Sequence, residues 1–137
     1  MTQESGTSGG VVVERLDHLV LTVRDMDASC AFYTGALGMT EERFAGDRRA
    51  LRFGMQTINL HQLGHEFEPK AATPTPGSAD LCFIVATPLD VVMDRLAAYG
   101  VALELGPVAR TGVLGEIASV SVCDPDGNLI ELPNYVL

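Results

Sequence analysis

Two histidines and two carboxylates are predicted to share one face of a sheet, where they suit a divalent cation. They belong to a set of polar residues from separate strand-like segments: His18, Arg52, Asn59, His61, Asp80, Ser119, Ser121 and Glu131. Neutral imidazole and carboxylate oxygen together favour Fe(II), Mn(II), Ni(II) or Zn(II), and two histidines with one carboxylate leave positions open for substrate or water. A metal in such an open site polarises a bound carbonyl or enolate and stabilises developing negative charge.

An ordinary solvated face of an antiparallel sheet is the simpler explanation of this pattern. Against it, the set holds two of the three histidines of the chain and lacks the lysines and threonines of a typical wet sheet. Single residues have alternatives too. His18 could be a hydrogen-bonded core histidine, Glu131 could pair with Arg52, and Asp80 could cap the turn that precedes it.

The strand-like segments fix which side chains face the same way, because successive side chains of a strand point to opposite faces. In the segment 16–23, the large apolar side chains share one face, and His18, Val20 and Thr22 share the other. In the segment 80–85, Asp80 likewise lies opposite the large apolar set. Further strands are predicted at 40–45, 50–53, 57–60, 102–105, 117–123 and 129–132.

Two helices of about three turns each are predicted, one after each long strand. The first follows Asp25 and ends at Gly38. The second follows Thr87, which is suited to cap it, with Pro88 at the first helical position and Gly100 at its end. The large apolar faces of the strands must pack on these helices, which leaves the polar set on the face away from them.

The order strand, helix, three strands occurs twice, which predicts a half-domain duplication within one domain. The segment that begins at His18 aligns with the one that begins at Asp80, 62 residues later. Between the halves, residues 64–78 contain three prolines and two glycines, which is typical of a linker. We therefore expect a disordered tail over 1–13 and one α+β domain over 14–137, with modules at 14–63 and 79–137.

The composition limits the partners of the chain. Its 137 residues suit one compact domain. With 9 basic and 18 acidic residues, the formal charge is −9 and no basic run is present, which disfavours nucleic acid and anionic membrane surfaces. A small neutral or metal-chelated ligand fits better. The N-terminal residues lack the basic and apolar regions of a signal peptide, so none is expected.

The cysteines predict a reduced compartment. Cys30, Cys82 and Cys123 are odd in number and form no CxxC pair, so neither a disulfide framework nor a thiolate zinc site is indicated. We interpret them as packing residues of a cytoplasmic protein.

The same residues carry a resemblance to a known family. The segment 16–23 with Phe32-Tyr33 and residues 37–39 resembles the opening of the vicinal oxygen chelate superfamily, and the segment 124–131 resembles its second hallmark. The superfamily includes glyoxalase I, extradiol dioxygenases, and the fosfomycin and bleomycin resistance proteins. The middle of the chain resembles a subgroup of small stand-alone glyoxalase-domain proteins. The resemblance covers about residues 14–135 and implies two βαβββ modules whose sheets curve around a metal.

The resemblance also implies roles for single residues. By match, His18 is the metal ligand of the first strand and Glu131 that of the eighth. The fifth-strand position is histidine in most metal-binding members but Asp80 here, so we predict that His61 supplies the missing ligand. Asp80 is then a fourth ligand or a catalytic base, and Glu131 and Asp80 are the expected catalytic residues. Arg52, Asn59 and Arg110 are expected to bind substrate, Arg110 from a loop through a carboxylate or phosphate.

Two classes of function remain open on the sequence. The first is a metalloenzyme whose substrate chelates the metal through adjacent oxygens, either a glyoxalase-like lyase or isomerase or an Fe(II) dioxygenase. The second is a metal-free protein that sequesters an antibiotic or metabolite, as bleomycin-resistance proteins do. Such proteins lack the ligand set, so His18 and Glu131 favour the enzyme. A homodimer is expected, because many family members form one with sites near the interface.

Overall fold

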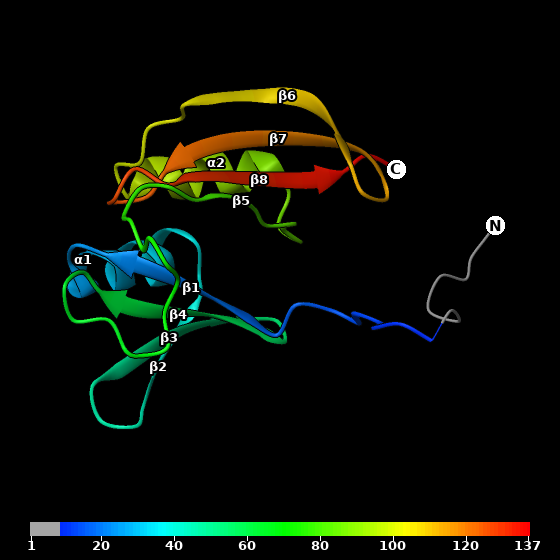
Figure 1. Ribbon diagram of the computed structural model, residues 1–137. Coiled ribbons are helices and arrows are strands. Elements are labelled where there is room, and N and C mark those ends of the chain that lie inside the picture. The colour runs from blue at the N-terminus through cyan, green and yellow to red at the C-terminus, as the bar shows by residue number, and fades with distance from the viewer. Residues whose placement is uncertain (1–8) are drawn as a thin grey trace.

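The computed structural model describes residues 9–137 as two halves with the same order of elements (Figure 1). The first half contains β1 His18–Val23, α1 Met26–Ala31, the π-helix η2 Phe32–Ala36, β2 Thr40–Phe44, β3 Arg48–Phe53 and β4 Gln56–Gln62. The second half contains β5 Asp80–Cys82, α2 Leu89–Ala98, β6 Leu105–Gly112, β7 Gly115–Cys123 and β8 Leu129–Tyr135.

Each half forms a four-stranded mixed sheet with the same strand order. Sheet A runs β1-β4-β3-β2 and sheet B runs β5-β8-β7-β6. The first strand of each half pairs in parallel with the last, and the other pairs are antiparallel. This confirms the predicted α+β fold of two tandem βαβββ modules. The hydrogen-bonded ladders form two open four-stranded sheets, which agrees with the curved sheets that the resemblance implies.

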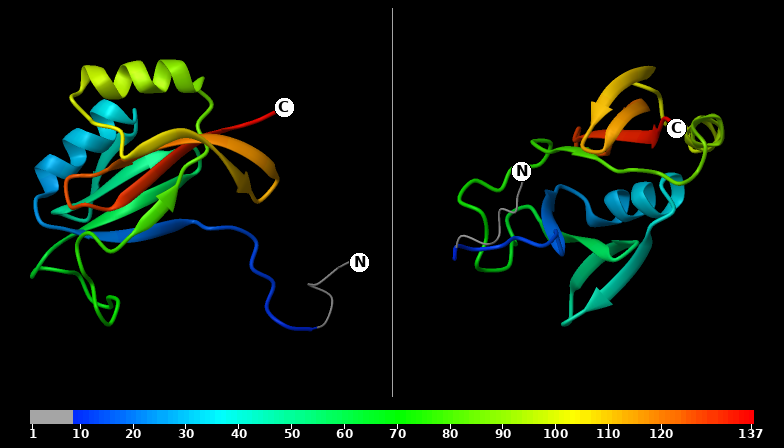
Figure 2. Two further views of the ribbon diagram at one scale, coloured as in Figure 1. Left: turned by 90° about the horizontal axis from the view of Figure 1, so that it is seen from above. Right: turned by 90° about the vertical axis from the view of Figure 1, so that its right-hand side faces the viewer.

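The hydrophobic core joins the two halves. Both helices lie on the same side of the sheets (Figure 2), and the core cluster takes buried side chains from α1, η2, α2 and both sheets. Leu21, Ile58 and Leu60 come from sheet A, while Val122 and Ile130 come from sheet B. These are the alternating apolar residues that the sequence assigns to the helix side, so the polar set faces away from the core.

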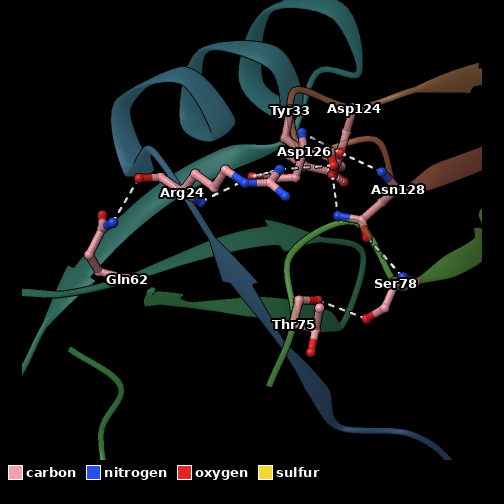
Figure 3. Close-up of polar contacts among 9 residues, drawn as sticks. Arg24, Tyr33, Gln62, Thr75, Ser78, Asp124, Asp126 and Asn128 are labelled. Carbon is pink, nitrogen blue, oxygen red and sulfur yellow. Dashed lines mark hydrogen bonds and ion pairs between the residues drawn. The ribbon is translucent and has the colours of Figure 1, made fainter. Parts of the chain in front are cut away.

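A buried turn between β7 and β8 ties the halves together (Figure 3). The Asp124 carboxylate accepts hydrogen bonds from the Tyr33 hydroxyl of η2 at 2.7 Å and from the side-chain amide of Asn128 at 2.8 Å. It also accepts from the backbone N–H groups of Asp126 and Asn128, each at 2.9 Å. The Asp126 carboxylate in turn accepts from the backbone N–H of Arg24, just after β1. This turn therefore connects the two modules.

The helices differ in detail from the prediction. The first continues from α1 into the π-helix η2, so its second half is wound more loosely than an α-helix. The second begins at Leu89, and Thr87 does not cap it. The side chain of Asn134 in β8 accepts the hydrogen bond of the Leu89 N–H at 2.9 Å, so the cap comes from a distant strand. The strand predicted at 102–105 lies instead at Leu105–Gly112.

The connecting segments complete the description. Residues 1–8 of the predicted tail lie outside the described residues, and Val11, Val12 and Val13 are exposed. The predicted linker 64–78 contains neither helix nor strand and passes in front of sheet A (Figure 1). No helix among the described residues combines the length and the apolar run needed to cross a membrane.

Candidate functional site

The strand register places the predicted polar residues of sheet A on one face. In β1 and β4, His18 lies opposite Thr57, Val20 opposite Asn59, and Thr22 opposite His61. Because residues directly opposite share a face and alternate residues keep it, His18, Asn59 and His61 point to the same side of sheet A.

Sheet B presents the matching face with its two carboxylates. Glu131 lies opposite Cys82 in β5 and Ser121 in β7, and Asp80 is two residues before Cys82. Asp80 therefore lies diagonal to Glu131 on the same face. His18 and Asp80, which the repeat aligns, each begin the first strand of their module.

The spacing along the strands separates the two predicted histidine ligands. His18 and His61 are four register positions apart on parallel strands, which corresponds to about 13 Å along the strand direction. Within residues 9–137, no three His, Cys, Asp or Glu side chains lie close enough together to hold a metal ion. One described protomer therefore does not assemble His18, His61 and Glu131, and the metal site stays a prediction.

Glu131 is positioned by a buried hydroxyl. Its Oε2 accepts a hydrogen bond of 2.7 Å from Ser119 of β7, a residue only 1% exposed. No hydrogen bond joins Oε1 to another described residue, so this oxygen is available to a ligand. Burial raises the pKa of the adjacent Cys82 thiol, and the charges of Glu131 and Asp80 raise it further. This part of sheet B is electronegative and suits a cation.

His18 is exposed and oriented by its sequence neighbour. Its Nδ1 lies 2.9 Å from a carboxylate oxygen of Asp17, and this hydrogen bond lowers the pKa of the Asp17 carboxyl. Because an ionised carboxylate can only accept, Nδ1 carries a proton, and Nε2 is the ring nitrogen left for a metal. This is the arrangement in which a carboxylate fixes the tautomer of a metal-binding histidine. The sequence analysis gave Asp17 no role, although its place beside His18 was a usable signal.

His61 has a different environment from His18. Its ring packs edge-on against Phe67 of the linker with 5.5 Å between centroids, and the Arg48 guanidinium lies 4.2 Å from the centroid of the same Phe67 ring. Burial lowers the pKa of His61, and the charge of Arg48 lowers it further. The imidazole is therefore neutral at neutral pH. It lines a cavity beneath the linker.

The predicted substrate-binding residues have other contacts. Both oxygens of the Glu42 carboxylate accept from the Arg52 guanidinium, at 2.6 and 3.1 Å. Arg52 therefore does not pair with Glu131. The side-chain oxygen Oδ1 of Asn59 accepts a hydrogen bond from the Thr57 hydroxyl at 3.0 Å. Arg110 was expected on a loop but belongs to strand β6, opposite Ile117, because the strand begins and ends later than the sequence pattern indicates.

The other two local alternatives, for His18 and Asp80, are not realised either. His18 is no core histidine, since 47% of its side chain is exposed. The Asp80 carboxylate makes no hydrogen bond within the described residues, so it caps no turn there. The cysteines are free, as predicted, but only Cys30 is buried, and Cys82 is exposed on the face that carries Glu131.

Comparison with known proteins decides the family. The model of the glyoxalase/bleomycin resistance protein/dioxygenase superfamily matches residues 15–132. The chain belongs to this superfamily. The resemblance inferred from the segments 16–23 and 124–131 is thereby confirmed.

This superfamily member has relatives with half of its residues in common. Virulence protein STM3117 of Salmonella typhimurium is 52% identical over 126 residues, which cover 92% of this chain and 88% of that protein. The glyoxalase domain-containing protein RDO1 of Mycosarcoma maydis is 52% identical over 123 residues, which cover 90% of this chain and 69% of that protein. The crystal structure of STM3117 superposes with a TM-score of 0.90 over 92% of this chain and all of that chain.

More distant superfamily structures share the fold. Lactoylglutathione lyase from Agrobacterium tumefaciens superposes with a TM-score of 0.67 at 22% identity and covers 89% of this chain and 94% of its own. The antibiotic-binding protein TnmS3 from Streptomyces superposes with a TM-score of 0.73 at 21% identity. The match covers 93% of this chain and 100% of TnmS3. Both enzymes and binding proteins therefore use this architecture.

Proposed function

We propose that this chain is a divalent-metal-dependent enzyme that acts on a small oxygenated substrate, with its metal bound between two copies of the chain. The carrying observation is the Glu131 carboxylate on the face of sheet B away from the core. Ser119 holds one of its oxygens, and the other has no hydrogen-bond partner among residues 9–137. Superfamily membership supports the proposal, because the family includes metal-dependent lyases and dioxygenases.

The donor chemistry fits a divalent ion, although one protomer does not bring the donors together. Glu131 and Asp80 supply carboxylate oxygens from sheet B, and His18 supplies Nε2 from sheet A. We propose that Glu131 of one copy and His18 of the second copy are ligands of the same ion. His61 is left out of this set because the register separates it from His18.

Exposed apolar side chains next to these donors support the second copy. Val20, two residues from His18 on the same face, is 45% exposed, and Ile84, just beyond β5, is 55% exposed. Burial of such side chains favours association by about 25 cal/mol per Å² of apolar surface. We therefore propose a homodimer in which the open faces of sheets A and B meet across the interface.

A metal bound there supplies a Lewis acid that polarises oxygens of the substrate. Asp80 lies diagonal to Glu131 and makes no side-chain hydrogen bond to residues 9–137, so it is positioned to accept a substrate proton. The sequence leaves both a lyase or isomerase and an Fe(II) dioxygenase open. They differ in whether the metal is redox-active, so consumption of O₂ by the Fe(II)-loaded protein with catechol separates them.

The second candidate is a protein that binds and sequesters a small molecule without metal. A cavity of about 660 Å³ between the linker and strands β1 and β4 favours it, because small-molecule sites commonly have volumes of this order.

Metal analysis distinguishes the two candidates. Protein purified without chelator, then loaded with Mn(II), Ni(II), Zn(II) or anaerobic Fe(II), is expected to retain about one ion per protomer and to elute as a dimer. The His18→Ala variant is expected to lose the ion, whereas His65→Ala, on the exposed linker, keeps it. If the wild type retains none of these metals, the enzyme proposal is wrong and the binding protein is favoured.

A further inference from the structure

The linker covers a cavity on the face of sheet A that carries His18. Residues of the linker pass over β1 and β4 and leave a cavity of about 660 Å³ between them. Thr22 and His61 form part of its floor, and they lie directly opposite each other in the register on the same face. Val20, which alternation places between His18 and Thr22, connects this cavity to the proposed metal ligand.

Several polar groups of the roof, those of Ser78, Thr75 and Asn128, already have hydrogen-bond partners. The Ser78 hydroxyl donates to the carbonyl of Thr75 at 2.8 Å, a contact visible in Figure 3, and the Thr75 hydroxyl donates to the carbonyl of Thr73 at 3.1 Å. Asn128, which also lines the cavity, uses its side chain to bind Asp124 and the backbone N–H of Ala79. These groups hold the linker in place and are not free to bind a ligand.

On the floor of the cavity, by contrast, Thr22 and His61 have polar side-chain groups without hydrogen-bond partners among the described residues. Among residues 9–137, no hydrogen bond joins the Thr22 hydroxyl or the His61 imidazole to another residue. Thr22 is only 8% exposed as a residue, but its hydroxyl oxygen is not one of the fully buried unpartnered atoms among the described residues, so it remains accessible from the cavity. A ligand can therefore replace the water at this hydroxyl and at the imidazole with hydrogen bonds of its own.

The charges around the cavity favour a neutral ligand. Lys70 is the one lysine, arginine or carboxylate among the lining residues, and its ammonium pairs with the Glu68 carboxylate. His61 is neutral at neutral pH because burial and Arg48 lower its pKa. A neutral imidazole can accept the proton of a hydroxyl, and Thr22 can donate to the oxygen of the same group. Val20 and Pro69 offer apolar contact to the rest of the ligand.

We infer that this cavity binds the neutral, hydroxylated part of a small organic molecule, with Thr22 and His61 as its hydrogen-bonding pair. That this molecule is the substrate rests on the proposed function, since the cavity begins beside His18. The binding itself requires neither the metal nor the second copy. His61 then has a substrate-binding role in place of the metal-binding role predicted from the sequence.

The test uses metal-free protein and trans-1,2-cyclohexanediol, a neutral diol with an apolar ring. Titration followed by the ¹⁵N and ¹H shifts of the His61 imidazole is expected to show saturable binding with a millimolar Kd, as befits a ligand of eight heavy atoms. Cyclohexanecarboxylate, of similar shape but anionic, is expected to bind more weakly.

Matched variants locate the binding. Thr22→Val preserves shape, and His61→Phe preserves the ring contact with Phe67, so both are expected to fold. Each variant is expected to raise the Kd for the diol about tenfold, because each loses one hydrogen bond to the ligand. Backbone amide shifts report the binding in both variants. His65→Phe, on the exposed linker outside the cavity, is expected to leave the Kd unchanged.

Three results would overturn the inference: no saturable change at His61, tighter binding of the carboxylate than of the diol, or unchanged diol binding in both floor variants. Because the protein carries no metal, these outcomes are independent of metal loading. Diol binding by a chain that retains no metal would contradict the enzyme proposal and leave the cavity assignment intact.

Discussion

Replacement of Glu131 by alanine is expected to lower the affinity of the protein for divalent metal by more than about 100-fold. The variant removes a carboxylate that the fold holds in one orientation through the Ser119 hydroxyl. Isothermal titration with Mn(II) measures the effect. Ser119→Ala keeps the carboxylate but removes its orienting bond, so a loss of about 10-fold is expected.

The expected loss of metal affinity in Glu131→Ala is larger than the loss of one negative charge would cause. Glu116→Ala removes the same charge from an exposed position of neighbouring β7, and its metal affinity is expected to equal that of the wild type. Equal losses in Glu131→Ala and Glu116→Ala would indicate nonspecific attraction to an acidic surface. Unchanged affinity in Glu131→Ala would remove Glu131 from the ligand set.

Replacement of Asp124 by alanine is expected to destabilise the folded protein by about 3–5 kcal/mol. The carboxylate is 5% exposed and accepts four hydrogen bonds, from Tyr33, the Asp126 N–H and two groups of Asn128. Its removal leaves these buried donors without a partner, which costs more than the bonds contributed. Urea unfolding followed by circular dichroism measures the free energy of unfolding.

Tyr33→Phe is the matched variant for this turn. It removes one donor and leaves three, so we expect a loss of about 1–2 kcal/mol. Burial and the nearby Asp124 charge raise the pKa of the Tyr33 hydroxyl, which therefore stays protonated and donates throughout the neutral range. If Asp124→Ala unfolds at the urea concentration of the wild type, the turn does not hold the modules together as the contacts indicate.

The sequence predicts the fold, and which face of its sheet each strand side chain occupies, because both follow from local alternation of apolar and polar residues. The period-two pattern in β1 places His18 away from the core, and the register agrees. Repetition of strand and helix predicts the two modules. The family motifs at both ends add specificity that periodicity does not have, and the family match confirms them.

The details that the sequence does not predict depend on distant contacts. Thr87 satisfies the local rule for a helix cap, but Asn134 of β8 provides the acceptor, and no local pattern links a residue to one 45 positions away. The pairing of β1 with β4 likewise sets His61 four positions from His18, a separation that alternation alone does not reveal. The predicted ligand set was based on the shared face alone, and it stays a prediction.

Mixing two variants tests most directly whether the metal lies between copies. His18→Ala and Glu131→Ala homodimers are each expected to bind no metal, because every site lacks one ligand. A mixed dimer has one site in which both ligands are intact and one in which both are missing. After equal mixing and exchange of subunits, the metal content is expected to recover to about a quarter of the wild-type value. A mixture that binds no more metal than either variant alone would contradict a site shared between two copies.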